Sequence, residues 1–148
     1  MGNVSAQLGQ RVYADANIII YAVEGFVAYL DQIRALMTAM NTGEVIIITS
    51  ELTLAEVLVK PLKDQNPAIQ QAYKTFLAPT PALEVAPISR DILEEAAQWR
   101  ATTKLKLPDA IHLATALRRQ CDSFLTNDDV FRNLGLPQIK MPSDVSLT

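Results

Sequence analysis

The feature that most limits the fold of this chain is a run of four consecutive β-branched apolar residues at positions 45–48. A strand without polar alternation is buried on both faces, which is typical of parallel strands covered by helices. Shorter strand candidates lie at 11–14, 83–86 and 123–126, and helical patterns separate them. This alternation predicts an α/β fold around a central, mostly parallel sheet.

Capping residues and prolines mark where the helices should begin and end. The pattern predicts helices at residues 18–21, 26–40, 50–61, 67–77, 89–99 and 109–119. Pro61 should end the third helix, because proline lacks an N–H and clashes with the preceding turn. Pro67 and Pro108 lie at first-turn positions, where proline is favourable.

Composition favours a single domain. The chain has 148 residues, of which 49% are hydrophobic and 20% charged, enough for one packed core over residues 1–148. The lone Cys121 cannot form an intrachain disulfide, and the sequence shows neither a secretory signal nor an apolar run of spanning length. We therefore expect a cytoplasmic protein. The formal net charge of −3 argues against broad affinity for polyanions, although a local basic rim would not show in the sum.

Four acidic residues lie where a predicted strand gives way to a helix, or inside the helix that follows. They are Asp15, Glu56, Asp109 and Asp128. Because the carboxyl ends of parallel strands converge at one edge of a sheet, we expect these side chains to meet there. Clustered carboxylates repel one another unless a cation lies among them, and Mg²⁺ or Mn²⁺ prefers oxygen ligands. The placement predicts one shared metal pocket.

Each of these acids also has an ordinary structural interpretation. Asp15 could be an N-cap, unless Asn17 takes over the capping and frees the carboxylate. Asp109 would be favourable in a first helical turn through the helix dipole. Glu56 could face the surface, although its flanking residues are apolar. Asp128 lies in an Asx-rich turn that could be simple capping.

Several other residues invite a functional interpretation that the sequence alone does not favour. His112, the only histidine, is one turn after Asp109 and could touch the same pocket, but a packed helix histidine is the simpler interpretation. Trp99 is most simply a core or interface residue. Lys104 and Lys106 lie just before Pro108, where the last predicted helix begins, and could contact a phosphate backbone. Solvated surface lysines are the alternative.

Four stretches of the chain together resemble the PIN-domain family, and more narrowly the VapC-type toxins of bacterial toxin–antitoxin pairs. The stretches are YADANIIIY at 13–21, SELTLAEV at 50–57, LPDAIHLATA at 107–116 and FLTND at 124–128. They occur in the family's order, and the resemblance covers nearly the whole chain. The resemblance implies a three-layer α/β/α fold with four or five strands in its sheet.

The resemblance also implies a metal-dependent endoribonuclease that hydrolyses RNA phosphodiester bonds with Mg²⁺ or Mn²⁺. It assigns the metal-binding and catalytic role to Asp15, Glu56, Asp109 and Asp128, with Asn17 and Thr126 as supporting polar groups. The implied partners are RNA, an antitoxin protein and a second copy of the chain. Helices 26–40 and 66–77 carry apolar and aromatic residues that a homodimer would cover.

Two other functions stay open. A PIN-fold RNA-binding or interaction module would have the same acids without cleaving RNA. A phospho-receiver-like signalling domain needs an acidic pair at the end of the first strand, where Asp15 and Asn17 supply only one acid. A dinucleotide-binding Rossmann domain is disfavoured, because the five glycines form no Gly-x-Gly-x-x-Gly turn.

Overall fold

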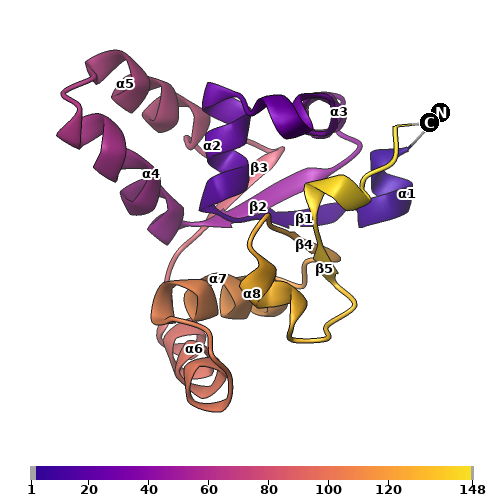
Figure 1. Ribbon diagram of the computed structural model, residues 1–148, viewed down its shortest axis with the longest axis vertical. Coiled ribbons are helices and arrows are strands. Elements are labelled where there is room, and N and C mark those ends of the chain that lie inside the picture. The colour runs from indigo at the N-terminus through magenta and orange to yellow at the C-terminus, as the bar shows by residue number, and fades with distance from the viewer. Residues whose placement is uncertain (1–2, 148) are drawn as a thin grey trace.

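The computed structural model, described here over residues 3–147, contains one sheet of five parallel strands with helices on both faces (Figure 1). The strands are β1 (Arg11–Ala14), β2 (Ile46–Ser50), β3 (Leu83–Ala86), β4 (Ser123–Leu125) and β5 (Ile139–Lys140). Their order in the sheet is β3-β2-β1-β4-β5, and every neighbouring pair is parallel. The predicted α/β/α architecture is confirmed.

The helices form two layers. They are α1 (Val4–Leu8), α2 (Ala16–Glu24), η1 (Val27–Tyr29), α3 (Leu30–Asn41), α4 (Glu51–Lys63), α5 (Pro67–Phe76), α6 (Arg90–Thr102), α7 (Leu107–Arg118), α8 (Asp129–Arg132) and η2 (Pro142–Asp144). In Figure 1, α2 to α5 lie on one side of the sheet, and α6, α7 and α8 on the other.

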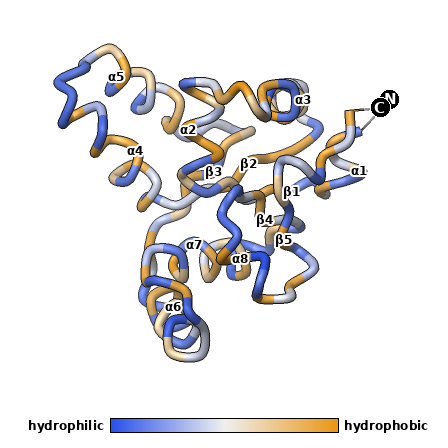
Figure 2. Tube along the Cα trace, viewed as in Figure 1, coloured by the Kyte–Doolittle hydropathy of each residue, from blue (hydrophilic) through white to orange (hydrophobic). Residues whose placement is uncertain are grey.

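Alternating side chains of the strands supply two hydrophobic cores, one for each layer. Val12 and Ile47 pack with the helices α2 to α5, whereas Tyr13, Ile48 and Phe124 pack with α6, α7 and α8. In Figure 2, β2 runs as a hydrophobic segment through the middle of the molecule. Burial on both faces explains why the strands have no polar alternation.

Three predicted helix starts are confirmed by their caps. The side chain of Ser50 accepts a hydrogen bond from Leu52 N at 3.1 Å, and that of Asn66 accepts from Ile69 N at 3.2 Å. Ser89 does the same for α6. These side chains satisfy backbone donors that the first turn leaves without a partner.

Pro61 does not end its helix, so that prediction was wrong. It lies in the last turn of α4, which continues to Lys63. A proline so near the end disrupts little of the helix, and its carbonyl still accepts from Asn66 N at 2.9 Å and from Gln70 Nε2 at 3.1 Å. Residues 26–40 also differ from the prediction, since the short η1 precedes α3.

The helix at 66–77 does not present its aromatic residues to solvent as expected. Tyr73 is fully buried, and Phe76 packs against the core from a partly buried position. The exposed large apolar side chains on this layer are instead Phe26, Val27, Val59 and Leu62, with exposed fractions of 38%, 92%, 50% and 56%.

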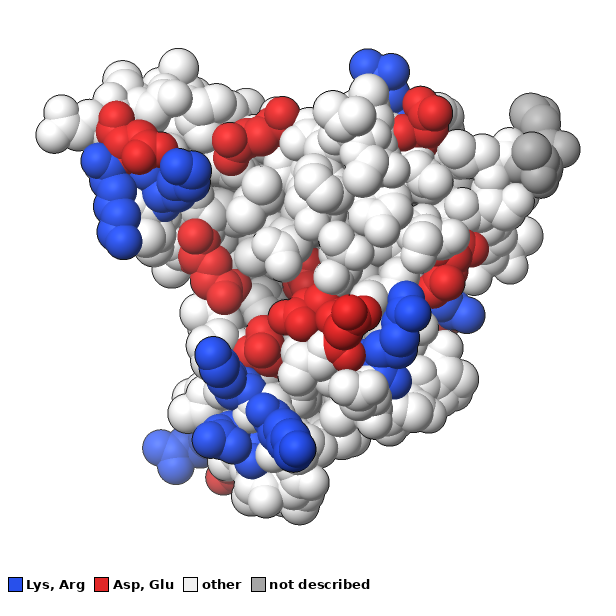
Figure 3. All heavy atoms as spheres, in the orientation of Figure 1, with Lys and Arg blue, Asp and Glu red and all other residues white. Residues whose placement is uncertain are grey.

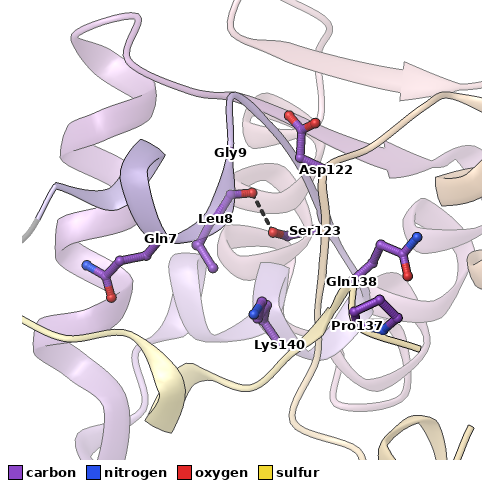
Figure 4. A pocket seen from close by; sticks show the side chains of 8 residues that line it. All are labelled: Gln7, Leu8, Gly9, Asp122, Ser123, Pro137, Gln138 and Lys140. Carbon is purple, nitrogen blue, oxygen red and sulfur yellow. Dashed lines mark hydrogen bonds between the residues drawn. The ribbon is translucent and has the colours of Figure 1, made fainter. Parts of the chain in front are cut away.

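Asp122 ties the amino ends of β1 and β4 together. Its Oδ2 accepts hydrogen bonds from Gln10 N at 3.0 Å and from Arg11 N at 2.9 Å. Gly9 has a φ of 80°, and a Cβ there would lie 2.3 Å from Asp122 Cβ. A hollow of about 330 Å³ opens beside this junction (Figure 4). It lies at the amino edge of the sheet and is lined by none of the four candidate carboxylates.

Within residues 3–147, no helix combines the length and the apolar character needed to cross a lipid bilayer.

Candidate active site

The four predicted acids lie at the carboxyl edge of the sheet. Asp15 directly follows β1, Asp128 precedes α8, Asp109 is in the first turn of α7, and Glu56 is inside α4. Figure 3 shows acidic side chains gathered in the middle of this face, between the α4 region and that of α7 and α8, with basic side chains on either side.

Asp15 is the most buried of the four, with 5% of its surface exposed. Its Oδ1 accepts a hydrogen bond from Ile18 N at 3.2 Å, and its Oδ2 accepts one from Thr126 Oγ1 at 2.5 Å. Burial raises the pKa of Asp15 to about 6, against the opposing effect of its hydrogen bonds. The carboxylate is therefore held in place and is costly to ionise.

Asp15, and not Asn17, caps α2. Because α2 begins at Ala16, Asn17 is already inside the first turn and its side chain is exposed. Of the two alternatives, the N-cap interpretation of Asp15 is therefore the one that the structure shows, and capping by Asn17 is not. Asp15 can both cap and face the acidic edge, since a carboxylate has two oxygens.

Thr126 links the carboxyl ends of β1 and β4. While its hydroxyl donates to Asp15, its Oγ1 accepts from Asp128 N at 3.1 Å. Asp128 Oδ1 in turn accepts from Val130 N at 3.1 Å and so caps α8. Thr126 thereby fixes the backbone that carries Asp128 relative to the carboxylate that follows β1.

Glu56 is bound by a histidine that the sequence did not assign to the site. His112 Nε2 lies 2.6 Å from Glu56 Oε1, and its Nδ1 lies 2.6 Å from the Tyr13 hydroxyl. Burial raises the pKa of Tyr13 well above its usual value, so the hydroxyl stays protonated. A carboxylate oxygen accepts, so the proton of the Glu56 contact lies on Nε2. In that neutral tautomer, Nδ1 accepts from the Tyr13 hydroxyl. The helical spacing of three residues from Asp109 was the signal available in the sequence.

Asp109 is half-buried and feels the charges of the other site residues. Burial is the main cause that raises its pKa, followed by the charge of Asp128; Glu56 adds to this effect. His112 and Lys106 act in the opposite direction. The charge of Asp128 also raises the pKa of Asp15. The four carboxylates thus form one electrostatically coupled group.

Comparison with known proteins identifies the fold family. Residues 12–136 match the family model of the PIN domain. This chain belongs to the PIN domain family. No curated protein matches it significantly over its sequence.

Several solved structures share the fold of this PIN domain. A toxin–antitoxin complex from Klebsiella pneumoniae is 27% identical, with a TM-score of 0.67 over 88% of this chain and 97% of that one. VapBC2 from Rickettsia felis, bound to a promoter DNA fragment, is 17% identical, with a TM-score of 0.70 over 89% and 98% of the two chains. VapC20 from Mycobacterium tuberculosis, described as a sarcin-ricin loop cleaving toxin, is 15% identical, with a TM-score of 0.68 over 87% and 98%.

The donor chemistry of the PIN domain suits a hard divalent cation. All four acidic groups offer oxygen. A cation would offset the burial that is the main cause of the raised pKa of Asp15 and Asp109, and also the smaller repulsion from Asp128. Among residues 3–147, however, no three acidic, histidine or cysteine side chains form a ready ligand set. The carboxylates are neighbours by their electrostatic coupling, while Glu56 is turned towards His112.

Lys104 and Lys106 flank the site on the loop that leads into α7. Both are exposed, and Lys106 is the N-cap residue of the helix. The effect of Lys106 on the pKa of Asp109 places its positive charge close to the acidic group.

Proposed function

We propose that this PIN domain is a metal-dependent endoribonuclease and the toxin of a toxin–antitoxin pair. The observation that carries the proposal is the coupled group of Asp15, Glu56, Asp109 and Asp128 at the carboxyl edge of the sheet. Membership of the PIN family supports it, as does the 27% identity to a chain of a toxin–antitoxin complex.

In this proposal the four carboxylates hold Mg²⁺ or Mn²⁺. A bound cation would supply an activated water and offset charge on the scissile phosphate. Thr126 and the backbone of α2 hold Asp15 in a fixed orientation, and His112 does the same for Glu56. Asn17, exposed beside Asp15, would contribute a polar group to the bound substrate or its water. No nucleophilic side chain is needed.

The approach of RNA to an acidic site requires positive charge. A bound cation would reverse the sign of the local charge at the carboxylates. Lys104 and Lys106 would contact phosphates beside the scissile one. If they do, replacing both with alanine reduces the slope of log affinity against log salt, by about 0.7 for each lost contact. An unchanged slope would remove the lysines from the RNA-binding surface.

The proposed partners follow from the same comparison. An antitoxin protein would bind this chain, as the description of the Klebsiella complex states for its own chains. We also propose a homodimer and a cytoplasmic location.

Asp109→Asn tests the catalytic assignment. The amide is nearly isosteric with the carboxylate but is a poor ligand for a hard cation. We therefore expect the rate at which a mixed RNA pool is cleaved in Mg²⁺ or Mn²⁺ to fall by more than about 100-fold. Loss of a residue that only supports a metal ligand costs roughly 10- to 100-fold, so the larger loss would identify Asp109 as a ligand. Circular dichroism should not change. Asp129→Asn is the matched control, because that neighbouring aspartate is exposed in the first turn of α8.

The variant would contradict the assignment if it kept its fold and cleaved RNA at the wild-type rate. Wild-type cleavage that persists in EDTA would argue against metal dependence.

A PIN-fold RNA-binding module without cleavage activity is the second candidate. The lack of a ready ligand set among the described residues is the observation that favours it. Binding of RNA without metal-dependent cleavage by the wild-type protein would establish this alternative. Membership of the PIN family leaves the phospho-receiver interpretation without support.

A further inference from the structure

A cavity of about 480 Å³ lies next to the acidic group, between the end of α6, the loop into α7, and α8. Its volume is within the range of about 300–1,000 Å³ that is typical of small-ligand sites. The lining residues that define its chemistry are Trp99, Lys104, Leu105, Val130, Asn133 and Leu134.

Two connections place this cavity beside the candidate active site. Val130, which lines it, donates its backbone N–H to Asp128 Oδ1 at 3.1 Å. Lys104, which also lines it, is two residues before Lys106, whose charge acts on Asp109. A nucleotide chain that crosses the acidic group would therefore reach the cavity within a short distance.

The indole of Trp99 is fixed in the cavity wall. It is partly buried against the core of the α6 and α7 layer, and its Nε1 donates to Glu95 Oε2 at 3.4 Å. Glu95 is itself held by Arg118, whose Nε lies 3.0 Å from Glu95 Oε1. An aromatic ring held in this way can accept a flat ligand without losing further side-chain freedom.

The remaining walls combine apolar surface with a few free polar groups. Leu105, Val130 and Leu134 are apolar, and the first of these is fully buried. Within the described part of the chain, the side chains of Asn133 and Lys104 make no hydrogen bond or ion pair, and both are exposed. An amide that can donate and accept is thus available next to an indole and an ammonium group.

We propose that this cavity binds one base of the RNA strand, next to the scissile phosphate. The base stacks on Trp99, the Asn133 amide hydrogen-bonds its edge, and Lys104 contacts the adjoining phosphate. Single-stranded RNA is recognised in this way, by aromatic stacking and by hydrogen bonds to base edges. The inference rests on the proposed function for the identity of the strand, and it makes Trp99 and Asn133 determinants of sequence preference.

Trp99 is the only tryptophan of the chain, so its fluorescence reports the event directly. We would titrate the wild-type protein in Mg²⁺ with six-nucleotide homopolymers of each base, and with an abasic oligonucleotide of the same length and charge. The base-bearing strands should quench the emission with saturation, whereas the abasic strand should not. Cleavage is followed in the same samples.

Variants at two positions localise the effect. Because the Trp99 variants lack the fluorescent indole, their binding is measured by isothermal titration calorimetry. Trp99→Leu should bind the preferred homopolymer about tenfold more weakly, the loss of one stacked base, and Trp99→Phe should restore part of the affinity. Asn133→Ala should keep the quenching but reduce the ratio of affinities between the best and the worst homopolymer. Asn41→Ala, an exposed amide at the end of α3, is the matched control and should leave that ratio unchanged.

The outcomes separate this inference from the proposed nuclease. Cleavage without base-dependent quenching would overturn the base site while the nuclease stands. Base-dependent quenching without cleavage would support the base site and count against the nuclease. Equal quenching by the abasic strand would also overturn the base site, because simple electrostatic binding would then explain the change in fluorescence.

Discussion

At the scale of single residues, Asp15 combines two structural tasks with its proposed metal-binding role. It caps α2 and accepts the hydroxyl proton of Thr126, yet it is 5% exposed and next to other carboxylates. The two hydrogen bonds favour the ionised form, but burial outweighs them and raises the pKa to about 6. Without a cation, the charge on Asp15 therefore costs stability at neutral pH.

The sign of this effect predicts how the stability of the protein depends on pH. The folded-state pKa of about 6 is above the ordinary value of 3.8, so the contribution of Asp15 to stability is full below pH 3.8 and is lost as the pH rises to about 6. In EDTA, the free energy of unfolding of Asp15→Asn relative to wild type should therefore increase between pH 4 and pH 7, by up to about 3 kcal/mol.

Urea unfolding at the two pH values measures this difference. Asp129→Asn is again the control, because its exposed carboxylate should give the same difference at both pH values. A difference between Asp15→Asn and wild type that does not change with pH would show that Asp15 ionises normally in the folded protein.

At the scale of elements, the sequence was informative wherever a local signal fixes the structure. β1 and β3 have the predicted bounds, and Ser50 and Ser89 cap the predicted helices. Local patterns gave no comparable signal for the two-residue β5, whose pairing with β4 depends on residues distant in sequence. The role of Pro61 was overestimated, because the cost of a helical proline depends on how much helix follows it.

The candidate site also combines features that the sequence predicts with contacts that it does not. The order of strands and helices was enough to predict which four acids share an edge of the sheet. The link from His112 to Tyr13 and Glu56 could not be read locally, because its two partners are 99 and 56 positions away. This chain of hydrogen bonds joins β1, α7 and α4, and it sets the direction of the Glu56 carboxylate.

Tyr13→Phe tests that link between elements. The change removes the hydroxyl that fixes the His112 ring, so we expect a loss of about 1–2 kcal/mol in stability and a weaker affinity for Mn²⁺. Urea unfolding and isothermal titration calorimetry measure the two effects. Tyr73→Phe is the matched control, since it removes another hydroxyl, one that donates to Glu24.

The two variants should lose similar stability but differ in Mn²⁺ affinity. Equal Mn²⁺ affinity in both would mean that Tyr13 and His112 are structural residues without influence on Glu56.

At the scale of the whole molecule, the two most exposed large apolar side chains are Val27 and Leu62, at 92% and 56%. Val27 lies on η1, after α2, and Leu62 lies in the last turn of α4. Glu24 at the end of α2 and Pro61 next to Leu62 line one small hollow, so these segments are neighbours. Exposed apolar side chains on neighbouring segments are candidates for a protein–protein contact.

The proposed homodimer would bury this apolar region, and the last prediction tests it. Light scattering at micromolar concentration should give the mass of a dimer for the wild type and that of a monomer for Val27→Asp or Leu62→Asp. Both positions are more than half exposed, so the fold should tolerate the charge. Leu93→Asp is the control: this leucine is 48% exposed on α6, across the sheet, and its replacement should leave the dimer intact. A monomeric wild type would remove the dimer from the proposal without affecting the nuclease, whose four carboxylates all come from one chain.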